Sequence, residues 1–327
     1  MTRRRILAAA LAAGLAFGFA SGFAAAQDAY PSKPIRLVVP FPPAGGTDVL
    51  SRAIAQAITN NTRWTFIIDN KPGAGGNIGL EAAAKAAPDG YTIAMGQTAN
   101  LAVNPALYSS MPFDPLKDFT PVALLSSQPL ILVVASNSPY RTLQELVDAA
   151  KASPGKINMA SSSNGTIGHI GGELFQRRAG IRMTHVPYKG AGPVVADLLG
   201  GNVDCFFGNT QAVGGLVTSG RLRALAVTSP QRLGNFPNVP TVAESGYPGF
   251  EAATWSGLVA PAGTPRAVVE RLNAEANKAL GNPEMKQKLY EDGSTPLGGT
   301  PAQFAAFIKT EHAKWGAAVR DAGIKLD

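Results

Sequence analysis

Residues 35–48 read IRLVVPFPPAGGTD, and this stretch contains the change of pattern that decides the fold. Ile35–Val39 is a short apolar run of the kind that forms a buried strand, whereas Leu50, Ile54 and Ile58 beyond it recur at helical spacing. Prolines and glycines separate the two patterns. A strand that passes through such a turn into an amphipathic helix predicts the βαβ unit of a parallel sheet covered by helices.

The same alternation continues along the chain. Further strands are expected near 64–68, 91–95, 157–160, 203–207, 224–228 and 254–260, and further helices near 78–87 and 171–178. Capping residues at Thr142, Thr264 and Thr300 predict three more helix starts, with a capping box at Thr142 and a proline after each of the other two.

Two apolar runs, Val122–Ser126 and Leu130–Ala135, follow each other with no helix between them. This break in the alternation predicts the crossing into a second domain. We therefore expect an α/β protein with two lobes joined by two crossing strands, each lobe a mainly parallel sheet flanked by helices. Lobe 1 is predicted to comprise 27–126 and 229–327, and lobe 2 to comprise 127–228.

The N-terminus predicts export. Arg3, Arg4 and Arg5 precede an apolar run that ends near Ala20, which is shorter than the roughly 18–20 residues that span a bilayer, and Ala24–Ala26 offers a cleavage site. We expect 1–26 to be a signal peptide and the mature protein to be periplasmic. The arginines also partly resemble a twin-arginine signal, so the export route stays open.

Composition excludes some classes of partner. Loss of the three arginines lowers the formal net charge of +7 to +4, which is too mild and too scattered to predict binding of nucleic acid. Cys205 is the single cysteine and cannot form an internal disulfide, and its apolar surroundings predict a buried, inert thiol. No cofactor is expected.

Enzyme signatures are mostly absent. The sequence has no phosphate-binding loop and no G-x-S-x-G elbow, and its three histidines lack the spacing of metal ligands, so no metal site is expected. Residues 73–78, GAGGNI, approach a dinucleotide fingerprint but have Ile78 in place of the third glycine. A loop entering a helix is the favoured interpretation.

Two similar strand-to-helix junctions remain, one in each predicted lobe. The first is 38–48 and the second is 158–169, NMASSSNGTIGH, and both pass through glycines and small hydroxyl or amide residues into a helix. A helix start exposes N–H groups and the positive end of the helix dipole, and glycine lets an anion approach them. Facing each other, the junctions would hold a short carboxylate by neutral groups. Ordinary helix capping by Thr47 or Asp48 is the alternative.

Longer blocks carry a resemblance to a known family. Residues 30–48 resemble the opening signature of the Bug family, the receptors of tripartite tricarboxylate transporters. The similarity continues through blocks at 70–79, 88–92, 165–170, 186–190, 225–229, 240–246 and 257–265, and so covers nearly the whole mature chain. Ala44 departs from the pattern, because the family usually has glycine there.

The resemblance implies a two-lobed, type II periplasmic-binding-protein fold that closes over its ligand like a Venus flytrap. It implies a carboxylate held between loops 41–48 and 161–166, often through ordered waters, and delivery to a large and a small membrane subunit. We expect a monomer that binds a di- or tricarboxylate, an amino acid or an aromatic acid without changing it. A ligand sensor that signals to a membrane kinase is an alternative, and an enzyme on the same fold is a weaker one.

Individual residues allow more than one role. Phe41 either walls the ligand or packs at the strand end, Tyr188 either donates its hydroxyl to the ligand or packs near the hinge, and His169 is expected to be structural. The predicted ligand-binding residues are Phe41, Pro42, Ala44, Gly45, Gly46, Thr47, Asp48, Thr98, Ser161, Ser162, Asn164, Gly165, Thr166 and Tyr188.

Overall fold

The computed structural model describes residues 30–291, 293–323 and 325. The chain divides into one unit formed by Met1–Ser32 and another formed by Lys33–Asp327, and every helix and strand below belongs to the second unit. The signal peptide predicted for 1–26 lies outside the described residues.

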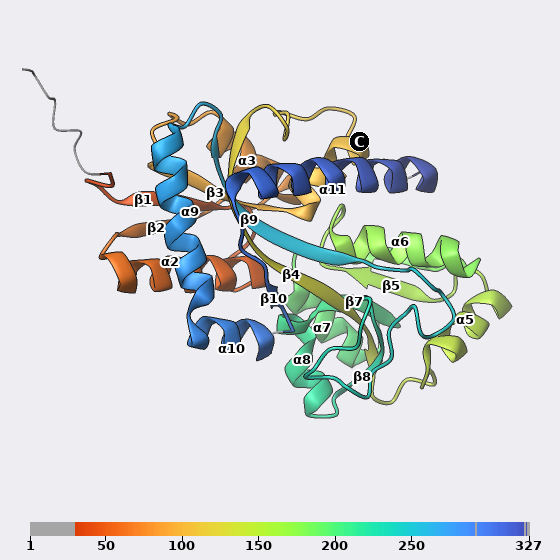
Figure 1. The fold of residues 1–327 in the computed structure, drawn as a ribbon. Helices are drawn as coiled ribbons and strands as arrows, with labels where there is room; N and C mark the ends of the chain where they lie inside the picture. Colours follow the sequence, from red (N-terminus) through yellow and green to blue (C-terminus); the bar gives the residue numbers. More distant parts are fainter. Residues whose placement is uncertain (1–29, 292, 324, 326–327) are drawn as a thin grey trace, which may run out of the picture. The chain divides into compact units, whose positions relative to one another are not determined.

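The described residues form strands and helices that largely alternate (Figure 1). The strands are β1 (Ile35–Val39), β2 (Phe66–Asn70), β3 (Thr92–Gln97), β4 (Phe119–Ala135), β5 (Asn158–Ser161), β6 (Thr184–Pro187), β7 (Cys205–Asn209), β8 (Leu222–Val227), β9 (Ala253–Pro261) and β10 (Thr295–Pro296). The helices are α2 (Gly46–Thr62), α3 (Asn77–Ala84), α4 (Asn104–Leu107), α5 (Leu143–Ala152), α6 (Ile167–Ala179), α7 (Ala191–Gly200), α8 (Thr210–Thr218), α9 (Arg266–Gly281), α10 (Pro283–Glu291) and α11 (Pro301–Ala322), with single-turn segments η1 (Ala74–Gly76) and η2 (Ala99–Val103).

The strands run in the order β2-β1-β3-β9-β4-β7-β5-β6, with β10 and β8 also paired to β4. We call β2, β1, β3, β9 and the first part of β4 lobe 1, and we call the rest of β4 with β7, β5, β6 and β8 lobe 2. Strands that alternate with helices pair in parallel, as β1 does with β2 and β3, and β5 with β6 and β7. The crossing strands β4 and β9 pair antiparallel with their neighbours, so both sheets are mixed.

Strand β4 connects the two lobes. The apolar runs 122–126 and 130–135, where the sequence predicted a crossing into a second domain, form one 17-residue strand that belongs to both lobes. Its residues up to Pro129 pair with β9, and from Leu130 onward they pair with β7 and β8. The polar residues between the two apolar runs continue the extended backbone, because their neighbours on β9 and β10 complete the ladder.

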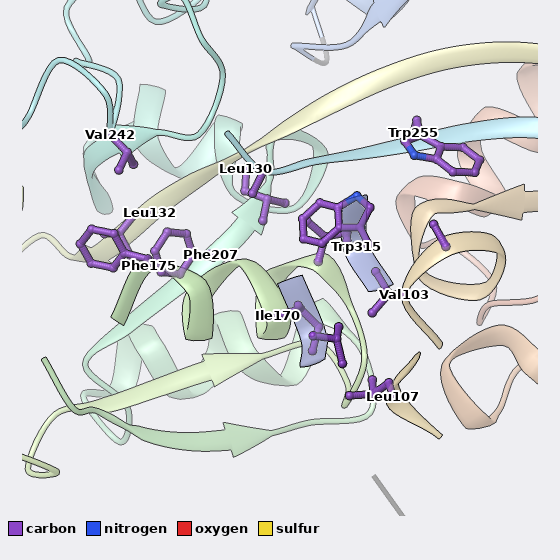
Figure 2. Close-up of a cluster of buried hydrophobic side chains, with 14 of the residues drawn as sticks. Val103, Leu107, Leu130, Leu132, Ile170, Phe175, Phe207, Val242, Trp255 and Trp315 are labelled. Carbon is purple, nitrogen blue, oxygen red and sulfur yellow. The ribbon is translucent and has the colours of Figure 1, made fainter. Parts of the chain in front are cut away.

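The most extensive buried cluster spans both lobes (Figure 2). Trp315 of α11, Val103 of η2 and Ile170 of α6 belong to it, and α11 contacts η2, α4 and α6. The indole N–H groups of Trp255 and Trp315 both donate to one carboxylate oxygen of Glu311, at 2.9 and 2.8 Å. The C-terminal helix therefore packs on both lobes and is fixed by buried polar contacts as well as by apolar ones.

The observed helix starts agree only in part with the caps predicted from the sequence. Thr300 forms the predicted kind of cap, with a full capping box. At Thr142 the side chain caps the helix, but Glu145 accepts from Arg141 N–H in place of the cap residue's own N–H. At Thr264 the prediction was wrong: Pro265 is the N-cap of α9, and the Thr264 hydroxyl donates to Pro261 O instead.

Two further sequence expectations concern burial. Cys205 is free and fully buried on β7, as predicted, and burial raises the pKa of its thiol. Within the part of the chain that the structure describes, none of the helices combines the length and apolar character needed to cross a bilayer.

Candidate functional site

A cavity of about 520 Å³ lies between lobe 1 and lobe 2. Small-molecule sites have volumes of about 300–1,000 Å³, so the cavity has room for a compact organic ligand. Both lobes and both crossing strands contribute to its lining. The lining residues include Phe41, Pro42, Gly45, Gly46, Thr47, Gly73, Gly76, Gln97, Ser126, Gln128, Ser162, Ser163, Thr166, Gly168, Tyr188, Lys189, Gly190, Asn209, Gln211, Thr254, Ser256 and Ser294.

Five helices begin at this cavity. The first turn of α2 and Gly76, the N-cap residue of α3, line it from lobe 1, and the starts of α6, α7 and α8 line it from lobe 2. Each helix start carries N–H groups that have no partner within the helix, together with the positive end of the helix dipole. Lys189 is the one charged side chain among the described residues that line the cavity. The cavity is therefore electropositive mainly through neutral backbone groups.

The junction of lobe 1 is shaped by Asp48, the third residue of α2. Its carboxylate accepts hydrogen bonds from Ala44 N–H (2.9 Å), the Arg52 guanidinium (2.9 Å) and the Asn70 amide (3.0 Å). Burial alone raises the pKa of Asp48, but these hydrogen bonds and the charge of Arg52 hold the pKa below its ordinary value. Asp48 is thus an ionised group that fixes the turn from within and does not line the cavity.

The junction of lobe 2 ends in a side-chain cap. The Thr166 hydroxyl accepts from His169 N–H at 3.4 Å and donates to Ser163 O at 2.9 Å. The loop is also tied to the segment before α7, because Tyr188 N–H donates to Ser161 O and Gly190 N–H to Ser162 O. The two loops of lobe 2 that line the cavity therefore form one connected backbone network.

The floor of the cavity comes from the crossing strands. Ser126 and Gln128 alternate along β4, and Thr254 and Ser256 lie opposite them on β9, where Ser126 pairs with Ser256 and Gln128 with Thr254. Alternate residues of a strand face the same side, so these four neutral polar groups line the cavity while Leu125 and Trp255 beside them are buried in the core. None of the four was predicted from the sequence, although Thr254 and Ser256 alternate with the apolar Trp255 in a way that was a usable signal.

Further amides and hydroxyls are linked across this floor. Gln97 of β3 donates to the Thr47 hydroxyl and, at 3.3 Å, to the Ser256 hydroxyl. Gln128 donates to the hydroxyls of Thr210 (3.2 Å) and Ser294 (3.1 Å). Each amide thus links two chain segments, and these bonds hold the polar side chains of the floor in fixed orientations.

The lobes meet directly at one edge of the cavity. A Cβ atom placed on Gly46, the first residue of α2, would lie 2.4 Å from Gln211 Oε1 and 3.0 Å from Asn209 Nδ2, both at the start of α8. Gln211 Oε1 is buried and has no hydrogen-bond partner among the described residues. A side chain at position 46 would therefore displace the ends of the Gln211 and Asn209 side chains from their present positions.

Eight of the fourteen predicted site residues line the cavity, namely Phe41, Pro42, Gly45, Gly46, Thr47, Ser162, Thr166 and Tyr188. The phenol of Tyr188 donates to Asp197 at 2.6 Å, which raises the pKa of Tyr188 to about 12. The hydroxyl hydrogen of Tyr188 is therefore engaged with Asp197, and Tyr188 does not offer it to a ligand in this structure.

The other six predicted residues do not line the cavity. Asn164 is exposed, and Thr98 is fully buried, where its hydroxyl accepts from Trp255 N–H at 2.8 Å. The remaining four contribute to the two junction loops from within: they are Ala44, Asp48, Ser161 and Gly165. Whether any of the fourteen contacts a ligand stays a prediction.

A two-lobed α/β fold with crossing strands and an electropositive cavity between the lobes defines a periplasmic binding protein of the solute-capturing class. The chain matches the family described as "Tripartite tricarboxylate transporter family receptor" over residues 50–324. It belongs to this family, whose members are periplasmic solute-binding receptors and include the Bug proteins. The fold class predicted from the sequence, and the resemblance on which it drew, are confirmed.

Individual relatives agree over nearly full length. The chain is 41% identical over 300 residues to the protein BugT of Bordetella pertussis, covering 91% of this chain and 92% of BugT. Among solved structures, Rpa4515 of R. palustris with adipate is 36% identical with a TM-score of 0.87, covering 91% of this chain and 100% of that one. MatC (Rpa3494) of Rhodopseudomonas palustris with bound malate is 30% identical with a TM-score of 0.83, covering 89% and 100%.

Proposed function

We propose that this receptor captures a small carboxylate between its lobes for a tripartite tricarboxylate-type transporter and releases it unchanged. The observation that carries the proposal is the convergence of five helix starts on one cavity. Backbone N–H groups at a helix start bind anions well, and glycine and hydroxyl residues leave them accessible. The adipate and malate bound by the two R. palustris proteins support a carboxylate for this chain.

The chemistry of the lining favours reversible capture. Neutral dipoles, with Lys189 as the only described charge, offer hydrogen bonds to a carboxylate without a buried ion pair that would be costly to separate. The lining residues named above supply amides, hydroxyls and backbone N–H groups and no recognisable nucleophile with a base. Binding with release therefore fits the site better than catalysis does.

Lobe closure is the proposed means of capture. We propose that 27–126 with 229–327 and 127–228 move as the two lobes, so that the contact of Gly46 with Gln211 forms on closure. Ligand binding favours the closed state only through contacts made preferentially in that state, which the junctions on opposite sides of the cavity would provide.

We further propose that residues 1–26 direct export and are removed, that the mature receptor is a periplasmic monomer, and that its partners are the large and small membrane subunits of the transporter. A sensor that signals to a membrane kinase would use the same clamp. A pull-down with the ligand-loaded receptor separates these outcomes by the membrane protein that is retained.

Thermal-shift screening of the mature receptor tests the ligand class. The panel holds adipate, malate, a tricarboxylate, acidic amino acids and aromatic acids, with neutral sugars and divalent cations as controls. We expect at least one carboxylate, and no sugar, to raise the melting temperature by mass action. A clear shift with a sugar or a cation and none with any carboxylate would overturn the proposal.

A serine variant tests the position of the ligand. Ser162→Ala removes a hydroxyl from the cavity lining while the Ser162 carbonyl keeps its bond to Gly190. A hydrogen bond to a charged group contributes about 1.5–3 kcal/mol, so affinity for the bound acid should fall about tenfold or more. Ser153→Ala, on the exposed end of α5, is the matched control and should bind as the unmodified receptor does.

A further inference from the structure

Two imidazole rings pack against the Ser161–Thr166 loop from outside the cavity. His169 is the third residue of α6 and His185 lies on β6. Their rings stack with centroids 3.9 Å apart and planes at 11°. His169 is 5% exposed, and neither ring belongs to the cavity lining formed by the described residues. The pair is therefore placed to act on the loop and not on a ligand.

Each ring holds one end of that loop. Gly165 N–H donates to Nδ1 of His169 at 3.2 Å, and Nε2 of His185 lies 2.6 Å from the hydroxyl of Ser161. Ser162 and Ser163, which line the cavity, lie between these two fixed points. The way in which the loop presents its lining residues thus depends on both rings.

The hydrogen bonds define the protonation of the pair. Because Nδ1 of His169 accepts, that ring is neutral and carries its proton on Nε2. The Ser161 hydroxyl donates to Ser163 O at 3.1 Å, so it accepts from Nε2–H of His185. Burial, followed by the neighbouring ring, lowers the pKa of His169 to about 3, and burial lowers the pKa of His185 to about 4. Both rings are neutral at neutral pH.

Lobe 1 has the same arrangement with different chemistry. Ala44 and Gly165 each precede an N-cap, each has a positive φ (62° and 76°), and each donates its N–H to the side chain of the third helical residue. That residue is the Asp48 carboxylate in lobe 1, where Arg52 balances the charge, and a neutral imidazole in lobe 2. A neutral acceptor makes the same bond without placing a second negative charge beside a site for anions.

We propose that His169 and His185 are positioning residues that hold the Ser161–Thr166 loop in the shape in which it receives the carboxylate. That the ligand is a carboxylate rests on the proposed function, whereas the role of the two rings in shaping the loop does not. Alternatively, the rings only fill space, and any side chain of similar volume would replace them. The two roles differ in whether an acceptor is needed at Nδ1 of His169 and a donor at Nε2 of His185.

Paired variants separate these roles. His169→Asn places an amide oxygen near the position of Nδ1, whereas His169→Leu fills the volume without an acceptor. Likewise, His185→Gln keeps a donor near the position of Nε2, and His185→Met does not. Amide-resolved hydrogen exchange of the ligand-free receptor measures the protection that the bond from Gly165 N–H to His169 gives to the Gly165 amide. Loss of one hydrogen bond should speed exchange of the Gly165 amide about tenfold or more in His169→Leu.

The expected result is rescue. Gly165 exchange in His169→Asn should stay within about twofold of the unmodified receptor, and the Ala44 amide of lobe 1 should be unaffected in every variant. The proposal is overturned if the Leu and Asn variants exchange alike, whether both are slow or both are fast. If His169→Leu does not fold, the comparison of His185→Met with His185→Gln decides by the same criterion at Ser162 and Ser163.

Titration of the same variants with adipate and malate adds the functional readout. Affinity should fall about tenfold in His169→Leu and recover in His169→Asn. A receptor that shows the predicted exchange pattern but binds no carboxylate at all contradicts the proposed function while the loop-shaping role stands. A receptor that binds equally in all variants contradicts the positioning role.

Discussion

Gly46→Ala is the most direct test of lobe closure. The added Cβ would lie 2.4 Å from Gln211 Oε1 and 3.2 Å from Gln211 Cδ across the edge of the cavity. The first distance is far inside van der Waals contact, so the Gln211 side chain must leave its position or the lobes must stay further apart. The atoms that the added Cβ meets are the ends of flexible side chains, so moving them costs about 0.5–1.5 kcal/mol, which corresponds to a loss of affinity of about 2- to 12-fold.

The same substitution should not weaken the fold. Gly46 begins α2 and its φ is not positive, so alanine fits the backbone there and has the higher helix propensity. We expect the free energy of unfolding in urea to be unchanged or to rise slightly, while calorimetric titration with the bound acid shows weaker binding. Gly215→Ala is the matched control, because a Cβ on that residue of α8 meets nothing within 4 Å.

A second substitution shows whether the clash is the cause. Gln211→Ala removes the side chain that the new methyl group would meet at the shortest distance, so the double variant should bind better than Gly46→Ala alone, or lose less than the two single changes combined. Unchanged affinity in Gly46→Ala refutes the reasoning. So does a loss of affinity that Gln211→Ala leaves as it was, because the effect would then arise elsewhere.

Two other predictions concern stability. The pKa values of about 3 for His169 and about 4 for His185 lie below the ordinary 6.5. The contribution of each neutral ring to the free energy of unfolding is therefore complete above pH 6.5, and it is lost as the pH falls towards 4 for His185 and towards 3 for His169. Between pH 7 and 5 protonation should lower the contribution of His169 to the free energy of unfolding by roughly 2 kcal/mol, and the more exposed His185 should contribute less. In urea unfolding, the free energy of unfolding of His169→Asn should therefore depend less steeply on pH than that of the unmodified receptor; an equal dependence would contradict this. Glu311→Leu leaves the buried N–H groups of Trp255 and Trp315 without their acceptor, and should destabilise the fold by about 2–5 kcal/mol in urea unfolding, with a loss below 1 kcal/mol as the contrary result.

Local pattern predicted most of the fold. Ile35–Val39 is β1 without change, and the helix predicted from Leu50, Ile54 and Ile58 is α2. These elements were predictable because the apolar residues of a buried strand and of an amphipathic helix recur with a period that is visible in the sequence. The continuity of β4 was not predictable, because the polar residues near its middle face the cavity, which only the paired strands reveal.

The candidate site was less predictable than the fold. Both junctions could be found by composition, since each places glycine and hydroxyl residues between a strand and a helix. The starts of α7 and α8, and the contact of Gln211 with Gly46, depend on how distant segments meet, and no local pattern encodes that. The roles of Asp48 and His169 were also hidden, because a residue that braces a loop from within has the same sequence signature as a plain helix cap.

Strand β4 has a mechanical consequence for the hinge. The two lobes share an uninterrupted length of extended chain, so any relative rotation must twist that chain, and the ladder bonds on either side resist it. Pro129 lies where β4 leaves β9, immediately before Leu130 joins β7, and proline has no N–H to donate. Because the ring of Pro129 fixes φ, a rotation of the lobes at this residue would fall on ψ, and it would break no hydrogen bond donated by Pro129.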